Sequence, residues 1–350
     1  MEVSADGFDV ARSGKVEPRT GPGSDVEVVG GDALESFIRH GMELFRDDHG
    51  ECLEGEVDLM VRGLTIMAHS TRRPGLADAQ FRLDLHNWDL RRVGPLHLAE
   101  SIASTPVLYD NIVSFDLRRA SIDDDALIAL AAHLPPAVRD MDLRSNAFGA
   151  RGLTVLCAAF LRRPIGIVAL NVSDNAAIGD AGTWPILRVA AACPTLTSLD
   201  LFHIGWSRDG ALVALRALAH CASLRRLAVG MARVGDQGAG IVAAGTAPIT
   251  DLAMDNCSIG DPGARSLALS QLRLHALHLR DNWIGDDGAR AIASAIATKQ
   301  PSLRHVDLTG NVVTGAGRDE LVRVQRQCSV SLSRNAFDEP IATFSPGHVP

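Results

Sequence analysis

Apolar and polar residues alternate along this chain with a period that switches repeatedly between two values. In the segment LHALHLRDN, which begins at Leu274, apolar residues fall mainly on every second position, as in a strand with one buried face. In the segment that follows, apolar residues such as Ala289, Ile292 and Ile296 recur at helical spacing. The pattern therefore predicts short strands and amphipathic helices in regular alternation.

The strand pattern recurs ten times. Its central apolar residue falls at Leu83, Phe115, Met141, Leu170, Leu199, Leu227, Leu252, Leu277, Val306 and Val330. Neighbouring members of this series are 24 to 32 residues apart, which is room for one strand, one helix and their turns. Since one such unit cannot bury its apolar side alone, the units are expected to stack on one another.

The predicted helices share a start signal. In IGDPGARSLAL, Asp261 is expected to accept a hydrogen bond from the free amides of the first helical turn, and Pro262 lies where a missing N–H has no cost. The same start recurs at Gly179-Asp180, Gly235-Asp236 and Gly285-Asp286. We therefore expect these aspartates to cap their helices.

The units resemble the leucine-rich-repeat family, specifically its ribonuclease-inhibitor-like subtype, over residues 81–337. The consensus L-x-x-L-x-L-x-x-N/C-x-L is best matched by the units that begin at Ile249 and Leu274. The resemblance implies an α/β solenoid of about ten repeats. It implies the shape of a right-handed horseshoe, with a parallel sheet on the concave face and helices on the convex face.

The resemblance also implies a buried polar residue in the turn after each strand, where its side chain satisfies backbone groups. That position holds Asn146, Asn175, Cys257, Asn282, Asn311 and Asn335. In the first, second, fifth and sixth units it holds instead Trp88, Ala120, Ile204 and Ala232. We therefore expect distorted turns in those four units.

The segments outside the repeats differ from them in composition. Residues 31–80 predict two amphipathic helices, the first with Asp32 and Glu35 in a capping-box arrangement. We interpret this region as a helical N-terminal cap over the apolar end of the stack, and alternatively as a docking site for a second protein. Residues 1–30, rich in Gly, Pro, Ser and charge, and residues 338–350 are expected to be tails.

Charge and hydropathy narrow the classes of partner. The net charge of −8 and the pI near 5.8 disfavour a nucleic-acid partner, because phosphate binding requires clustered Lys and Arg. The first ten residues lack the basic flank and the apolar run of a secretory signal, and no later segment holds about 18 uncharged apolar residues in a row. We therefore expect a cytoplasmic protein without a membrane partner.

The motifs that carry chemistry are missing from the sequence. It holds no nucleophile elbow, phosphate loop or HExxH, and its six cysteines include no CxxC pair. His278, His305 and Asp307 fall on adjacent predicted strands, but a zinc site needs three or four converging ligands. We therefore expect no catalytic residues, no metal and no small-molecule cofactor.

Candidate binding residues lie where strand side chains point away from the helices. In the first units these positions hold aspartates and arginines side by side. They favour either solvated, mutually compensated pairs or a recognition stripe formed by Arg118, Arg119 and Arg144.

Later units carry a second kind of candidate. Phe202, His203 and Met231 are expected to form an apolar anchor for a partner, whereas Trp206 is favoured to lie in the core. The same face continues through three further candidates at Asp255, His278 and Arg280.

These observations favour a noncatalytic module that binds a protein on the concave face. Two alternatives stay open. One is a GTPase activator resembling Ran-GTPase activators, in which an arginine or asparagine on the rim would stabilise phosphoryl-transfer charge. The other is a substrate receptor or effector, in which the N-terminal 80 residues recruit a second protein.

Overall fold

Strands and helices alternate throughout the part of the chain that the computed structural model describes, which is residues 81–336 without 88–89, 91–94, 105 and 163–164. The strands are β1 (Phe81–Asp84), β2 (Ile112–Asp116), β3 (Asp140–Asp142), β4 (Ala169–Asn171), β5 (Ser198–Asp200), β6 (Arg226–Ala228), β7 (Asp251–Ala253), β8 (Ala276–His278), β9 (His305–Asp307) and β10 (Ser329–Ser331). The helices are α4 (Pro95–Ala103), α5 (Pro106–Asn111), α6 (Asp124–Ala132), α7 (Ala150–Arg162), η2 (Asp180–Gly182, a 3-10 helix), α8 (Thr183–Ala192), α9 (Arg208–Leu218), α10 (Gly235–Ala243), α11 (Asp261–Ala268), α12 (Asp286–Thr298) and α13 (Gly315–Val324).

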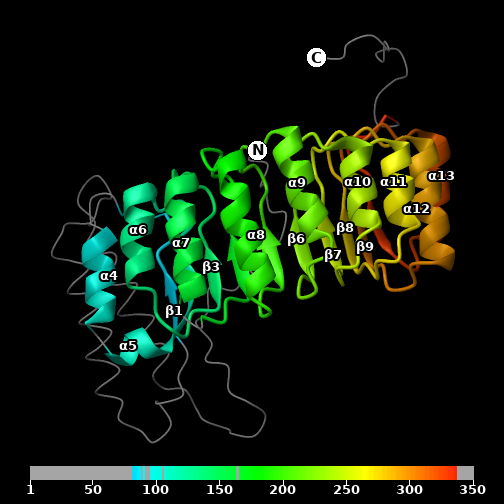
Figure 1. Cartoon of the computed structure of the whole chain (residues 1–350). Helices are drawn as coiled ribbons and strands as arrows, with labels where there is room; N and C mark the ends of the chain where they lie inside the picture. Colours follow the sequence, from blue (N-terminus) through cyan, green and yellow to red (C-terminus); the bar gives the residue numbers. More distant parts are fainter. Residues whose placement is uncertain (1–80, 88–89, 91–94, 105, 163–164, 337–350) are drawn as a thin grey trace, which may run out of the picture.

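The strands form one parallel sheet whose spatial order, β1 to β10, is the order of the sequence. Figure 1 shows the helices stacked side by side along this sheet. Each apolar residue predicted to centre a strand lies in one, and the register pairs it with its counterpart, as Leu199 with Leu227 and Leu227 with Leu252. The predicted α/β solenoid of ten units is therefore confirmed.

The core lies between the sheet and the helices. Strand residues such as Leu227 and Leu252 are fully buried, and the predicted face of α12, with Ala289 and Ile292, is buried against them. Trp206 is 8% exposed and belongs to this core, as expected. None of the described helices is long and apolar enough to cross a membrane. The predicted cap at 31–80 and the tails at 1–30 and 338–350 lie outside the described residues.

The asparagines of the turns form a ladder of hydrogen bonds, which we call the asparagine ladder (Asn146, Asn175, Asn282, Asn311 and Asn335). The Asn282 carboxamide oxygen accepts from the N–H groups of Cys257 and Ile259 at 3.0 and 2.9 Å. Its amino group donates to the Met254 and Arg280 carbonyls at 2.9 and 3.1 Å. Each such side chain therefore joins the turn of its own unit to that of the unit before.

Turns without this asparagine have a different backbone. Where Ala120, Ile204, Ala232 or Cys257 takes its place, the next residue has a positive φ, at Ser121 (57°), Gly205 (78°), Arg233 (45°) and Ser258 (61°). The expected distortion is thus confirmed at Ala120, Ile204 and Ala232, while Trp88 lies outside the described residues. Cys257 is buried and its thiol donates to the Val229 carbonyl at 3.3 Å, as expected for this position, although its turn has the altered backbone as well. A Cβ at Gly205 would lie 1.9 Å from the Ala176 carbonyl oxygen, so only glycine fits there.

The prediction that Asp261 caps its own helix is wrong. Asp261 occupies the first residue of α11, and its carboxylate accepts instead from the N–H groups of Gly285 and Gly288, at the start of α12 in the next unit. Its counterparts do the same: Asp236 binds Gly260 and Gly263, Asp286 binds Thr314 and Gly317, Asp180 binds Ser207, and Asp124 binds Gly149 and Gly152. We call these contacts the aspartate bridges.

In α11, α12 and α13, which receive an aspartate bridge, the carboxylate and an apolar side chain of the glycine's own unit together crowd a glycine of the first turn, whereas at Gly238, which has no bridge, Val234 does so without a carboxylate. A Cβ at Gly288 would lie 2.7 Å from Asp261 Oδ1, and one at Gly263 would lie 2.6 Å from Asp236 Oδ1. The carboxylate of the preceding unit occupies the space of a side chain. In the sequence Asp261-Pro262-Gly263, the aspartate therefore contacts the next unit and the glycine contacts the aspartate of the preceding unit.

Candidate binding surface

The sheet face opposite the helices, which we call the open face, presents two parallel rows of side chains. The first row follows the buried centre of each strand, and the register aligns Asp142, Asn171, Asp200, Ala228, Ala253, His278 and Asp307. The second row lies two residues further along and contains Arg118, Arg144, Ser173, Phe202, Gly230, Asp255, Arg280 and Thr309. Most of the candidates named from the sequence belong to these rows.

The acids of the first row have a structural role. Asp142, Asp200 and Asp307 accept the N–H of the residue two positions later, at 3.1, 3.0 and 2.9 Å. Asn171 does the same for Ser173 at 2.9 Å. The recurrent acid after the buried residue thus satisfies a strand-end amide, so its presence alone does not indicate a binding site.

The arginines of the first units are paired. Arg118 donates to both Asp116 oxygens at 2.7 Å and lies 3.6 Å from Asp142, while Arg144 lies 3.8 Å from the same Asp142 carboxylate. This agrees with the interpretation as compensated pairs. Arg119 lies outside the rows, because it occupies the following turn with a φ of 53°.

The middle of the open face is apolar. The Phe202 ring lies over Gly230, where an added Cβ would be 2.1 Å from the ring. In the first row, Ala228 and Ala253 replace the acids and are 5% and 4% exposed. We call these four residues the central patch. Met231, at the turn beside it, is 44% exposed.

His203 does not join the central patch. Like Met231 it has a positive φ, of 50° against 57°, which places both residues in turns at the rim of the sheet. The His203 Nδ1 atom lies 3.2 Å from an Asp174 carboxylate oxygen in the preceding unit. The expected anchor therefore consists of Phe202 on the face and Met231 at the rim.

The last group of candidates is brought together by the structure. The Arg280 N–H donates to the Asp255 carboxylate at 2.8 Å, and the Arg280 guanidinium lies 3.7 Å from Asp307. His278 pairs with Asp307 in the sheet register, and burial lowers its pKa. Asp255, His278 and Arg280 thus form one polar neighbourhood next to the central patch, in which burial favours the neutral form of His278.

Two carboxylates on this face have no cation within 4 Å among the described residues, Asp200 and Asp255. Burial raises the pKa of each to about 6. The backbone N–H from which each accepts a hydrogen bond lowers the pKa, but by less than burial raises it. The sequence analysis missed Asp200 as a candidate. The sequence did contain an indication, because the two positions that follow Asp200 in the first row, Ala228 and Ala253, are uncharged.

Metal and thiol chemistry find little support on the described residues. Those residues include no group of three His, Cys, Asp or Glu side chains placed to hold a metal ion. Their cysteines are free thiols, and burial raises the pKa of Cys157 and Cys257 to about 12. Such thiols are poor nucleophiles, because the thiolate is the reactive form.

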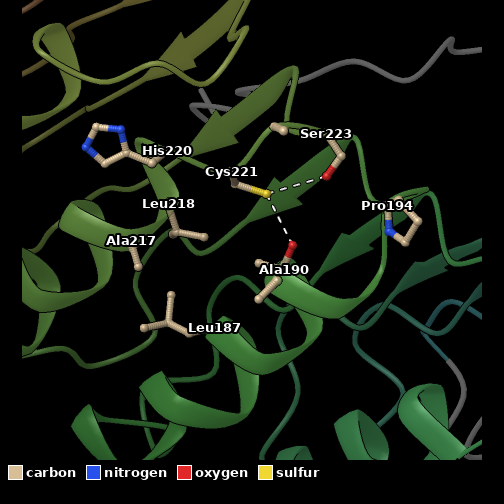
Figure 2. Close-up of a pocket in the computed structure, with 10 residues that line it drawn as sticks. Leu187, Ala190, Pro194, Ala217, Leu218, His220, Cys221 and Ser223 are labelled. Atoms are coloured by element: carbon tan, nitrogen blue, oxygen red, sulfur yellow. Dashed lines mark hydrogen bonds between the residues drawn. The ribbon is translucent and has the colours of Figure 1, made fainter.

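A cavity of about 420 Å³ lies on the helical side, between α8 and α9. Figure 2 shows its lining, which includes Leu187, Leu218 and Cys221. The Cys221 thiol donates to the Ala190 carbonyl at 3.2 Å and lies 3.4 Å from the Ser223 hydroxyl. The wall is mainly aliphatic, so it offers van der Waals contact but no assembled chemistry.

Comparison with known proteins supports the repeat. A family model described as Leucine Rich repeat matches residues 248–268, 274–293 and 299–322. No curated protein matches the sequence.

Similar solved structures include the TLR13–ssRNA13 complex, with 16% sequence identity and a TM-score of 0.42 over 74% of this chain and 36% of that chain. Another is a Bacteroides fragilis protein, with 13% identity and a TM-score of 0.41 over 79% of this chain and 71% of that chain. A third is the tropomodulin C-terminal domain of Caenorhabditis elegans, with 16% identity and a TM-score of 0.33 over 45% of this chain and 90% of that chain. This chain thus spans little more than a third of the first. At these TM-scores the likenesses carry no argument about function, and the ribonuclease-inhibitor-like subtype stays a prediction.

Proposed function

The chain is a leucine-rich-repeat protein, and on that basis we propose that it is a noncatalytic module that binds a protein partner on the open face of its sheet. The observation that carries the proposal is the central patch, an apolar interruption between two charged stretches of the same face. Ala228, Ala253 and Gly230 are buried, so the contact area of the patch is supplied by the partly exposed Phe202, and Met231 extends it at the rim. Aromatic and methionine side chains in such a setting are typical of interface anchors.

The dimensions of the open face suit a protein ligand. Ten strands spaced by about 4.8 Å span roughly 45 Å. A stable protein interface buries about 800 Å² on each partner, which this length accommodates. The excess carboxylates at Asp200 and Asp255 would repel phosphate, so we propose a protein rather than a nucleic acid. Cytoplasmic residence and the absence of a cofactor belong to the same proposal.

The test is crosslinking mass spectrometry with the full chain in extracts of its own host, comparing the unchanged protein with Phe202→Ala. We expect Phe202→Ala to reduce the recovery of crosslinked partner at least tenfold, because it removes the aromatic anchor. The matched control is Trp184→Ala, which removes a 69% exposed aromatic side chain from α8 on the helical side. Equal loss in both variants, or crosslinks confined to the helices, would contradict the proposal.

A further inference from the structure

The arrangement of charge around the central patch points to the chemistry of the partner, provided that the open face is the binding surface. We infer that the partner presents an apolar side chain between two basic ones. The apolar side chain contacts the central patch, one basic side chain contacts Asp200 and the other contacts Asp255. This inference rests on the positions of six residues in two rows on three neighbouring strands or strand ends.

Asp200 and Asp255 occupy opposite corners of that block. The first row holds Asp200, Ala228 and Ala253, on β5, β6 and β7. The second row, two residues further along the same strands, holds Phe202, Gly230 and Asp255. An apolar centre with a carboxylate at each end of its diagonal is thus built into the sheet.

The charge balance of the open face leaves these two carboxylates in excess. Arg118 and Arg144 lie against Asp116 and Asp142, and Arg280 lies against Asp307. At the rim, Arg334 pairs with Asp281. No cation of the described residues lies within 4 Å of Asp200 or Asp255, and the guanidinium groups of Arg144 and Arg280 act on them only from further away, so a cation of the partner can approach each carboxylate more closely.

Burial makes this lack of counter-ions costly. It raises the pKa of both carboxyl groups, since each charged form is held away from water and accepts a hydrogen bond from one backbone N–H, of Phe202 for Asp200 and of Arg280 for Asp255. A lysine or arginine of the partner would remove that cost on binding. Such desolvated charge pairs contribute more to specificity than exposed pairs do.

The spacing of the two acids suits an extended peptide. Two strand spacings of about 4.8 Å and two residues of about 3.3 Å along a strand place them roughly 12 Å apart. In an extended chain, side chains at positions i, i+2 and i+4 share one face, and the outer two are about 13 Å apart. A segment of the form basic-x-apolar-x-basic therefore matches the block.

The experiment uses three pools of synthetic 12-residue peptides that share a central Leu or Phe. The flanking positions are Lys in the first pool, Glu in the second and Ser in the third. Each pool is passed over the immobilised full chain at low salt, and the retained peptides are quantified by mass spectrometry. We expect at least tenfold greater retention of the Lys pool than of either other pool, falling to near equality with the double variant Asp200→Asn/Asp255→Asn. The control is Asp319→Asn, which removes an exposed carboxylate from α13.

The outcomes separate this inference from the proposed function. Equal retention of the three pools, or a Lys preference that survives in the double variant, would overturn the basic partner. If the pools are retained equally while Phe202→Ala still abolishes partner crosslinking, the open face binds a protein of different chemistry. If the crosslinking test also fails, the proposed function fails with it. Thermal unfolding of each variant checks that the fold is intact.

Discussion

The C-terminal units, residues 236–335, and the central units, residues 178–235, have the same strand and helix but are joined differently. In the C-terminal units the aspartate bridges run without interruption, and the asparagine ladder is complete from Asn282 onward, after Cys257. The asparagine ladder continues through Asn282, Asn311 and Asn335, and the aspartate bridges through Asp236, Asp261 and Asp286. Consecutive units there are therefore joined by the same two kinds of hydrogen bond.

In the central units the asparagine ladder is interrupted, and the aspartate bridges are reduced to the one from Asp180 to Ser207. Ile204 and Ala232 replace the ladder asparagine, and Arg208 stands where the aspartate that would reach α10 should be. The Gly235 N–H instead donates to the Cys257 carbonyl at 2.8 Å, and Gly235 has a φ of 60°. The backbone is thus satisfied by a different route, and the apolar central patch lies on these same units. Departures from local consistency often mark functional sites, which is why we place the binding surface here.

The largest effect is expected from Asn282→Ala in the C-terminal units. Truncation removes the partner of the buried Cys257 and Ile259 N–H groups and of the Met254 carbonyl, and is expected to lower the free energy of unfolding by about 3 kcal/mol. Urea denaturation measures this. Gln271→Ala, which truncates an exposed carboxamide, is the control and should change stability by less than about 0.5 kcal/mol. A loss below about 1 kcal/mol would mean that the ladder does not hold the units together.

Two glycine substitutions sharpen the role of the aspartate bridges. Gly288→Ala places a Cβ 2.6 Å from Ile284 Cγ2 and 2.7 Å from Asp261 Oδ1, so we expect a loss of about 2 kcal/mol despite the better helix propensity of alanine. Gly240→Ala in α10 has no atom within 4 Å of the new Cβ and should gain about 0.5 to 1 kcal/mol. Thermal unfolding compares them. Equal shifts in the two variants would mean that neither Asp261 nor Ile284 excludes a Cβ at Gly288.

Asp261→Ala should have a smaller effect. It deletes the hydrogen bonds to the Gly285 and Gly288 N–H groups at 2.7 and 2.9 Å, but water can reach part of this site, so we expect a loss of about 1 to 2 kcal/mol. Hydrogen exchange of the first turn of α12 should increase, while that of α11, which contains Asp261, should change less. The reverse order would support capping of its own helix. The control is Asp209→Ala, an exposed acid in the first turn of α9.

The smallest effect concerns the pH dependence in the central units. Burial raises the pKa of Asp200 to about 6 from an ordinary value near 3.8, so the folded state favours the protonated form. Its contribution to stability is therefore complete below about pH 4 and is lost as the pH rises through about 6. Asp200→Asn keeps an acceptor for the Phe202 N–H, as Asn171 does for Ser173, and should stabilise the fold by about 1 kcal/mol at pH 7.5 but not at pH 4. The measurement is the melting temperature of Asp200→Asn and of the unchanged protein at pH 4 and pH 7.5. A gain of the same size at pH 4 would exclude titration of Asp200 as the cause.

Local periodicity was enough to place every strand and the buried faces of helices such as α12. The reason is that burial of a strand or helix face imposes its own period on the residues next to it in sequence. The buried turn position of the asparagines followed instead from the resemblance to the leucine-rich-repeat family. The core position of Trp206 followed from local reasoning, the altered turns at Ile204 and Ala232 followed from the resemblance, and the pairing of Arg118 was one of two alternatives that the sequence left open.

Contacts between units could be decided only in three dimensions. The partner of Asp261 is 24 residues away at Gly285, at a distance that stacking sets and that no local pattern encodes. The positive φ that moves Arg119, His203 and Met231 to the rim depends on how each turn meets the next. Whether Asp200 is paired depends on the side chains that the sheet register places beside it, and that register belongs to the stack as a whole.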